Sequence, residues 1–189
     1  RTIHTSQLRF LVTHQALFDS RVLDGRIMEG HGDLRPDHVY LYKQPIVIDC
    51  IEFNREYRTN DIIDELAFLA MCCDRMGEAG VGNALFSAYE SASQDRCDLQ
   101  ITAFYKSYRA CVRAKVAGIR CQQNSKQESD SSSRKEHDYL DLASRYLAEL
   151  DAPLVLMIGG RMGSGKSTLS EFIKHYLSET YGLNVVVMS

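Results

Sequence analysis

Two acidic residues in the first third of the chain could together activate a hydroxyl group. Asp33 follows His31 and Gly32 in a short turn, and Asp49 follows the apolar residues 46–48. One carboxylate could accept the proton of a hydroxyl, and the other could bind Mg²⁺, which prefers oxygen ligands. The pair predicts a site for hydroxyl chemistry beside a metal ion, provided that the fold brings both side chains together.

The segment between the two acids is predicted to form a β-hairpin. Residues 38–43 and 46–50 are rich in Tyr, Val and Ile, which favour strands, and Pro45 sits where a turn can use its fixed φ. A turn centred on the Gln-Pro dipeptide would place Asp49 roughly opposite Val39. The hairpin would then return the second carboxylate to the loop that holds the first.

A glycine-rich stretch in the last part of the chain has the composition of a phosphate-binding loop. Residues 160–167, GRMGSGKS, match the pattern GxxxxGK[ST] between an apolar run and an amphipathic segment. The glycines let backbone N–H groups turn towards phosphate oxygens, Lys166 can reach the β- and γ-phosphates, and the Ser167 hydroxyl can bind Mg²⁺. The predicted nucleotide site, with ATP and Mg²⁺ as cofactors, comprises Gly160, Gly163, Ser164, Gly165, Lys166, Ser167 and Thr168.

The remaining segments are predicted to be mostly helical. Glycines at positions 77, 80 and 82 are expected to break the chain between two helices, and apolar runs at 154–158 and 183–188 predict strands on either side of the last helix. The predicted helices cover residues 6–23, 60–76, 83–93, 99–120, 137–150 and 166–177. We interpret Lys106, Arg109, Arg113 and Arg120 as a solvated face, although a role in binding phosphate or an acidic ligand stays open.

Composition limits the compartment and the classes of partner. The formal net charge of −3 gives no case for nucleic acid or an anionic membrane, and no apolar run approaches the ~20 residues that a membrane span needs. The six cysteines include no CxxC pair, which favours reduced, mostly buried thiols and a cytoplasmic location. The chain begins with Arg1 rather than Met, so we expect it to be part of a longer protein.

The domain organisation follows from the polar stretch Gln122–Glu136, which lacks apolar residues and is predicted to be a flexible loop. Residues 1–121 form the first predicted domain, and residues 122–150 form a flexible linker with a connecting helix. Residues 151–189 form the start of a P-loop domain.

The spacing of the first site resembles that of a known family. His31-Gly-Asp33, followed after four residues by His38, and the segment Ile48–Asn54 resemble the catalytic loop and metal-binding segment of the aminoglycoside-phosphotransferase branch of the kinase-like fold. In particular, the chain resembles tandem proteins that join such a domain to a P-loop ATP-binding domain of the AAA, zeta-toxin or gluconate-kinase-like kind. The fold implied is α/β (α+β): a mostly helical kinase-like C-lobe with a β-hairpin, followed by the first βαβ of a parallel-sheet domain.

The resemblance also implies roles for individual residues. Asp33 would be the catalytic residue that orients or deprotonates the acceptor hydroxyl, and Asp49 would hold Mg²⁺. The family has Asn at the position of His38, whose nitrogen suits Mg²⁺ less well than oxygen does. The segment that begins at Asp64 resembles one that braces the catalytic loop, which implies a structural role. The candidate metal ligands are Asp49, His38 and Ser167.

The function implied is transfer of the ATP γ-phosphoryl group to a small-molecule hydroxyl, by a protein with a second, P-loop ATP-binding module. The alternative is a P-loop ATPase or kinase whose kinase-like half is a non-catalytic regulatory scaffold, which His38 in place of Asn favours. The expected partners are ATP and a hydroxyl acceptor that the sequence does not identify. A nucleic-acid-linked ATPase is a weaker option, because the chain has no basic–aromatic platform.

Overall fold

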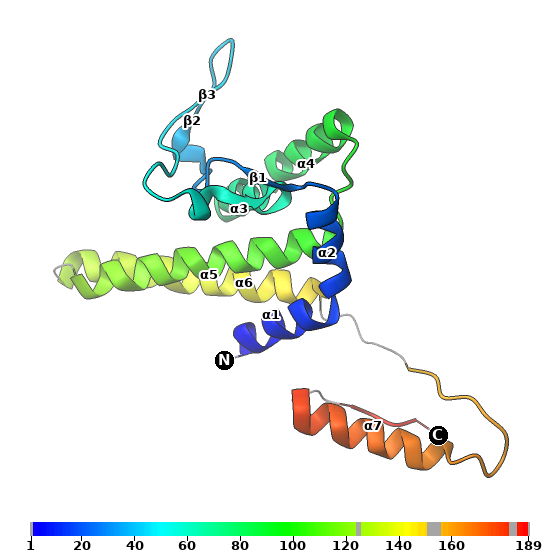
Figure 1. Cartoon of the computed structure of the whole chain (residues 1–189). Coiled ribbons are helices and arrows are strands. Elements are labelled where there is room, and N and C mark those ends of the chain that lie inside the picture. Colours follow the sequence, from blue (N-terminus) through cyan, green and yellow to red (C-terminus); the bar gives the residue numbers. More distant parts are fainter. Residues whose placement is uncertain (1, 124–125, 151–155, 182–184, 189) are drawn as a thin grey trace. The chain divides into compact units, whose positions relative to one another are not determined.

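The structure, a computed structural model, describes residues 2–123, 126–150, 156–181 and 185–188. It divides into two compact units, residues 1–151 and 152–189, which are described separately. The first unit is mostly helical with two small antiparallel sheets, the α+β character that the sequence predicts (Figure 1). Its elements are α1 (Thr2–Thr13), α2 (Gln15–Leu23), β1 (Ile27–Glu29), a 3₁₀ turn (Pro36–His38), β2 (Val39–Tyr40), β3 (Ile46–Val47), a second 3₁₀ turn (Arg55–Arg58), β4 (Thr59–Asp61), α3 (Ile62–Arg75), α4 (Ala79–Ser93), α5 (Leu99–Gln123) and α6 (Lys126–Leu150).

Helix α3 is the central element of the first unit and packs against both α4 and α5. Its cap is Asp61, whose carboxylate accepts a hydrogen bond from the backbone N–H of Ile63 at 2.9 Å. Ile63 and Phe68 are almost inaccessible to solvent and belong to two different apolar clusters. Burial on more than one side explains why apolar residues cover most of the circumference of this helix.

Helices α5 and α6 lie side by side over most of their length (Figure 1). Helix α6 begins at Lys126, so the prediction of a flexible loop through Glu136 is wrong for the residues that the structure describes. Two features explain the longer helix. The segment 122–150 contains neither Gly nor Pro, and the small Gly118 on α5 lets the Glu136 side chain approach closely.

The predicted break between the two helices is present at Gly77, which has φ +87°, but Gly80 and Gly82 lie inside α4, which already begins at Ala79. A β-carbon at Gly82 would lie 2.9 Å from the β-carbon of Ala70 on α3. Gly82 is therefore the residue that lets the two helices touch. The single helix predicted over residues 6–23 is also wrong, because the chain forms two helices there, α1 and α2, which are divided at His14.

The hairpin between the two candidate acids is confirmed, but its register is not the one predicted. Val39 pairs with Val47 and Tyr40 with Ile46, so the turn is centred on Lys43 rather than on the Gln-Pro dipeptide. Asp49 therefore lies beyond the paired residues and not opposite Val39. The other sheet joins β1 to β4, a strand that was not predicted and whose residues 60–61 were assigned to the start of a helix.

The second unit contains α7 (Lys166–Tyr181), preceded by the glycine loop. Of the two predicted strands, 154–155 and 183–184 lie outside the described residues, and residues 156–158 and 185–188 are not in strands. The described residues therefore show no parallel sheet. A strand is held by backbone hydrogen bonds to a neighbour, and neither apolar run has a paired neighbour among the described residues.

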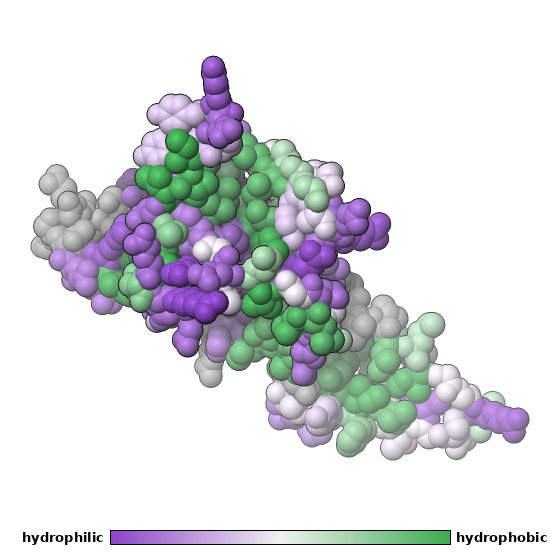
Figure 2. All heavy atoms as spheres, turned by 45° about the horizontal axis from the view of Figure 1, so that its top comes forward, coloured by the Kyte–Doolittle hydropathy of each residue, from purple (hydrophilic) through white to green (hydrophobic). Residues whose placement is uncertain are grey.

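Hydrophobic and hydrophilic side chains are interspersed on the face shown in Figure 2. Two large side chains of the hairpin, Leu41 and Tyr42, are 84% and 70% exposed. No described helix combines the length and the apolar character needed to cross a lipid bilayer.

Candidate functional site

The loop that carries Asp33 is anchored to helix α3 through Gly32. The backbone N–H of Gly32 donates to both carboxylate oxygens of Glu65, at 3.1 and 3.0 Å. Gly32 has φ +82°, and a β-carbon there would lie 2.9 Å from the carbonyl oxygen of Tyr57. Only glycine fits this position without displacing the backbone around it.

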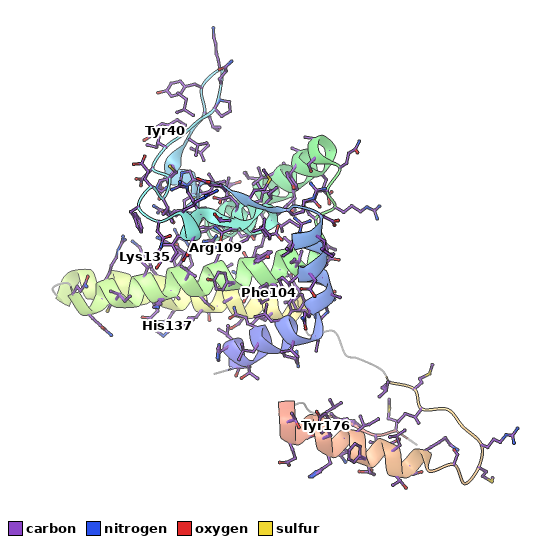
Figure 3. All side chains as sticks on the ribbon, viewed as in Figure 1. Tyr40, Phe104, Arg109, Lys135, His137 and Tyr176 are labelled. Atoms are coloured by element: carbon purple, nitrogen blue, oxygen red, sulfur yellow. The ribbon has the colours of Figure 1, made fainter. Side chains whose placement is uncertain are left out.

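Arg109 holds the other side of the same loop. Its Nη1 donates to the carbonyl of Gly32 at 3.3 Å, and its Nε donates to Asp64 at 2.8 Å as part of a two-pronged contact. Figure 3 shows Arg109 extending from α5 towards α3. Burial alone would lower the pKa of Arg109, but its hydrogen bonds to Asp64 outweigh this and raise the pKa, so the guanidinium stays charged.

The prediction that the basic residues of α5 form a solvated face is therefore wrong for two of them. Arg109 is 8% exposed, and Lys106 forms an ion pair with Asp74 at 3.0 Å. Both face α3, because this side of α5 is the one that packs in the interior. The structural role expected for Asp64 agrees with its contact to Arg109, since the pair joins α3, α5 and the loop.

Asp33 is bound by its neighbour Arg35, which the sequence analysis did not single out. The Nε of Arg35 donates to Asp33 Oδ2 at 2.9 Å, and its Nη2 lies 2.7 Å from His38 Nε2. His38 Nδ1 lies 3.0 Å from the carbonyl oxygen of Asp33. A carbonyl can only accept, so Nδ1 carries the proton and Nε2 accepts from Arg35.

Asp49 completes the cluster from the far end of the hairpin. Its Oδ2 lies 3.3 Å from His38 Nε2, while its side chain is 75% exposed. The two acids predicted to cooperate, Asp33 and Asp49, thus both lie beside His38, but only Asp33 is linked to it by hydrogen bonds, because an unprotonated Nε2 cannot donate to Asp49. Ser167, the remaining candidate ligand, belongs to the second unit.

The cluster offers few ligands for a metal ion. Among the described residues, no group of three or more His, Cys, Asp or Glu side chains is placed to hold one. His38 uses Nδ1 towards Asp33 and Nε2 towards Arg35, so it does not fit as a ligand in this arrangement. The carboxylate of Asp49 does fit Mg²⁺, which commonly takes one or two carboxylates and completes its shell with phosphate oxygens and water.

The glycine loop of the second unit has the backbone that phosphate binding requires. Gly163 and Gly165 both have φ +80°, a conformation in which successive N–H groups can turn to one side. Lys166 is the first residue of α7, and its Nζ donates to the carbonyl oxygens of Gly160 and Arg161 at 2.9 and 2.7 Å. The ammonium group is therefore held over its own loop, where it would meet phosphate oxygens.

The other residues of the predicted nucleotide site lie in the same loop or at the start of α7. A β-carbon at Gly160 would lie 2.7 Å from Ser164 Oγ, so a side chain there would require the Ser164 hydroxyl to rotate away. Ser167 and Thr168 lie in the first turn of α7, where the unpaired N–H groups of a helix favour an anion. These residues fit a nucleotide phosphate group.

Two residues that matter to the first site were missed from sequence. Glu65 belongs to the segment that begins at Asp64, for which a structural role is predicted without assigning Glu65 a contact of its own, and no role is predicted for Arg35. The signal for Glu65 was a carboxylate in the first turn of a helix that directly follows the site in the chain. The signal for Arg35 was a cation two residues after the candidate base, although its partners depend on the fold.

Mycobacterial proteins are similar to the chain along nearly all of its length. The chain is 34% identical over 178 residues to uncharacterized protein Rv2004c of Mycobacterium tuberculosis (strain ATCC 25618 / H37Rv), and equally to uncharacterized protein Mb2027c of Mycobacterium bovis. The match covers 94% of this chain and 34% of each relative, so the chain spans about a third of the length of the curated relatives it matches. No family model matches the chain, and no solved structure matches it.

Proposed function

We propose that the chain belongs to an ATP-dependent phosphotransferase that transfers the γ-phosphoryl group to a small-molecule hydroxyl, with a second, P-loop nucleotide site. A cytoplasmic location is part of this proposal. The observation that carries it is the cluster around His38, in which Asp33 is bound by Arg35 and Asp49 Oδ2 lies 3.3 Å from His38 Nε2. In this proposal Asp33 is the candidate base and Asp49 is the carboxylate that suits Mg²⁺.

In this proposal each residue has one task. Asp33 receives or orients the proton of the acceptor hydroxyl, and Arg35 fixes the direction of its carboxylate. Asp49 would hold Mg²⁺, which would neutralise phosphate charge when bound. Glu65 and Arg109 keep the loop in place, so that catalysis rests on positioning and charge rather than on a covalent intermediate.

The second unit would bind its own nucleotide. Lys166 would exchange its two carbonyl contacts for phosphate oxygens, and the N–H groups of the glycine loop would turn towards the same oxygens. The Ser167 hydroxyl would contact Mg²⁺ there. This site supports a P-loop kinase or ATPase module irrespective of the chemistry in the first unit.

One observation favours a different function for the first unit. His38 donates to the Asp33 carbonyl and accepts from Arg35, so both of its ring nitrogens are used and it is not available as a metal ligand. A non-catalytic unit that regulates the P-loop module would be consistent with that arrangement. The P-loop module would then be the part that uses ATP.

Calorimetric titration with ATP and Mg²⁺ separates these functions, using a protein of the relatives' length that contains this chain. The proposal expects two binding events, one removed by Lys166→Ala and the other weakened by Asp49→Asn. Lys174→Ala, a half-buried lysine on the same helix as Lys166, and Asp19→Asn, an exposed carboxylate on α2, are the matched controls. A single event that disappears with Lys166→Ala alone would support the regulatory function.

Product analysis then tests the chemistry itself. Asp33→Asn keeps the shape of the side chain but cannot accept a proton, so transfer by the first unit should fall by roughly 10²–10⁴-fold. Lys166→Ala should leave this transfer in place, because Lys166 lies in the second unit. Unchanged transfer in Asp33→Asn would exclude the role assigned to Asp33.

A further inference from the structure

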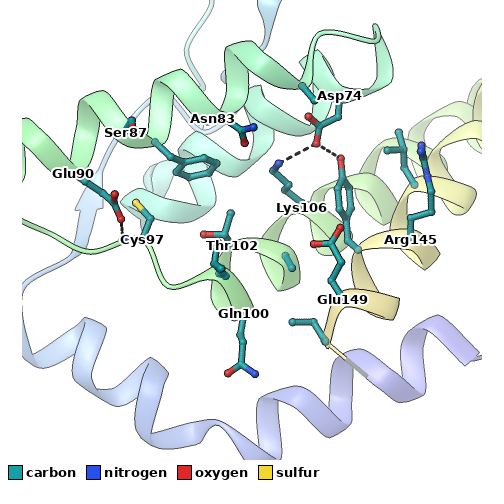
Figure 4. A pocket seen from close by; sticks show the side chains of 17 residues that line it. Asp74, Asn83, Ser87, Glu90, Cys97, Gln100, Thr102, Lys106, Arg145 and Glu149 are labelled. Atoms are coloured by element: carbon teal, nitrogen blue, oxygen red, sulfur yellow. Dashed lines mark hydrogen bonds and ion pairs between the residues drawn. The ribbon is translucent and has the colours of Figure 1, made fainter. Parts of the chain in front are cut away.

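A cavity of about 700 Å³ lies in the first unit, between α4, α5, α6 and the end of α3 (Figure 4). This volume is in the range of sites for small organic ligands. Its floor is buried and mainly apolar, and its rim is polar. Phe86, Ala103, Leu142 and Tyr146 contribute to the floor, while Asn83, Ser87, Glu90, Gln100, Arg145 and Glu149 contribute to the rim.

Thr102 is the residue that marks this cavity as more than a packing defect. It lines the cavity from α5, it is 9% exposed, and its buried Oγ1 hydroxyl has no hydrogen-bond partner among the described residues. Buried hydroxyls in native proteins nearly always have a partner in the protein, in ordered water or in a ligand. A polar occupant of the cavity would supply this partner once the Thr102 side chain turns its hydroxyl to the cavity surface.

The charges on one wall of the cavity are already matched. Asp74 Oδ2 accepts from Lys106 Nζ at 3.0 Å and from the Tyr146 hydroxyl at 2.6 Å, as Figure 4 shows. The same ammonium group lies 5.8 Å from the ring centre of Phe86 and 5.5 Å from that of Tyr146. This wall satisfies its own cation and does not require a charged ligand.

The rim carries both signs of charge. Arg145 and Glu149 lie one turn apart on α6, and Glu90, whose Oε1 accepts from the backbone N–H of Cys97 at 2.7 Å, lies on α4. A ligand with a single net charge would meet a like charge on this rim. Hydroxyl groups can donate to the carboxylates and accept from the guanidinium and the amides, and an apolar ring face suits Phe86.

We propose that this cavity binds a neutral ligand of about one sugar ring that carries several hydroxyl groups. The cavity is separate from the Asp33 cluster, because Asp74 lies nine residues after Glu65 on α3, or roughly 14 Å along the helix. The proposal therefore does not depend on the phosphotransferase function.

Titration of the chain with myo-inositol and with glucose tests the proposal, followed by calorimetry or ligand-observed NMR. Thr102→Val replaces the hydroxyl with a methyl group of similar size and should weaken binding by about tenfold. Ser87→Trp should block the rim without disturbing the core, since Ser87 is exposed. Ser107→Ala is the control, because it removes a hydroxyl on the same helix that is bound by Gln7 and is not part of the cavity lining.

Two further probes test the chemical class. Cyclohexanol has the same ring size as myo-inositol with a single hydroxyl, and glucose 6-phosphate adds charge to glucose. The proposal expects both to bind more weakly than their neutral, fully hydroxylated counterparts. It is overturned if neither polyol binds at millimolar concentrations, if Thr102→Val and Ser87→Trp both leave binding unchanged, or if cyclohexanol or the phosphate ester binds more tightly.

Discussion

The backbone N–H of Gly32 donates to both carboxylate oxygens of Glu65, although 33 residues separate the two in the chain. Arg109 reaches the carbonyl of the same glycine from α5. The position of the Asp33 loop is therefore set by two helices that follow it in the sequence, and not by the hairpin alone. Changes to these contacts should be measurable both in stability and at the site.

Replacement of Gly32 by alanine should destabilise the fold by about 3 kcal/mol, because it combines a positive φ with a β-carbon 2.9 Å from the Tyr57 carbonyl. Gly77→Ala is the matched control. It has a similar φ of +87° but open space around the position, so a cost of about 1 kcal/mol is expected. Urea denaturation of both variants measures the difference. Equal losses would show that backbone conformation, and not contact with Tyr57, determines the requirement for glycine.

Arg109→Met should cost about 3–5 kcal/mol, since it leaves the buried carboxylate of Asp64 without its partner. Arg120→Met, on the exposed end of the same helix, should change the free energy of unfolding by less than about 0.5 kcal/mol. The double variant Arg109→Met/Asp64→Leu should regain part of the loss, because no unpaired charge is then buried. A double variant less stable than Arg109→Met would contradict this account.

The free energy of unfolding should decrease in acid, in part because the Asp95 carboxylate becomes protonated. Burial alone would raise the pKa of Asp95, but hydrogen bonds from Arg21 and Tyr89 outweigh it and hold the pKa below its ordinary value. The unfolded carboxyl group then binds its proton at a higher pH than the folded one. The contribution of Asp95 is therefore present at neutral pH and is lost as the pH falls through the folded pKa.

Urea midpoints measured roughly between pH 7 and pH 2 test this expectation. Asp95→Asn should be less stable than the parent at pH 7 and should lose less stability on acidification. Asp19→Asn, on the exposed side of α2, should follow the parent curve. A parallel decline in Asp95→Asn and the parent would assign the acid sensitivity to other groups.

Cysteine reactivity should differ sharply between Cys50 and Cys72. Burial raises the pKa of the Cys72 thiol to about 11, whereas Cys50 is exposed in the segment after the hairpin. Iodoacetamide at pH 8 should therefore modify Cys50 first, because the thiolate is the reactive form and must be accessible. Peptide mass spectrometry over time measures both rates, and modification in urea should remove most of the difference. Equal rates in the native protein would contradict the burial of Cys72.

Local patterns in the sequence predicted that most of the helices and the hairpin exist, but not all of their bounds or the hairpin register, because only the existence of an element follows from spacing that the chain carries by itself. The apolar residues of α3, the strand-forming residues beside the turn and the glycine loop before α7 are of this kind. The start of α4 was not predicted, since Gly82 is tolerated in a helix only because Ala70 of α3 packs against it. The contact between Gly82 and Ala70 joins two helices and cannot be read from the residues around Gly82.

The candidate site, too, could be predicted only in part from the sequence. The types and spacing of Asp33 and Asp49 suggested that they cooperate, and the structure places both around His38 and Arg35. The contacts that hold this cluster could not be predicted. Glu65 and Arg109 come from helices whose faces are assigned only when the whole unit is packed, and a basic stripe on α5 has the same sequence whether it faces water or α3.

Asp49 has φ +63°, in the left-handed region that few side chains adopt without strain. Glycine would relieve that strain but would remove the carboxylate, and β-branched or bulky residues would increase it. Aspartate and asparagine are among the few residue types that combine this backbone with a polar side chain. Most single substitutions of Asp49 would therefore either strain the turn or remove the carboxylate that we propose binds Mg²⁺.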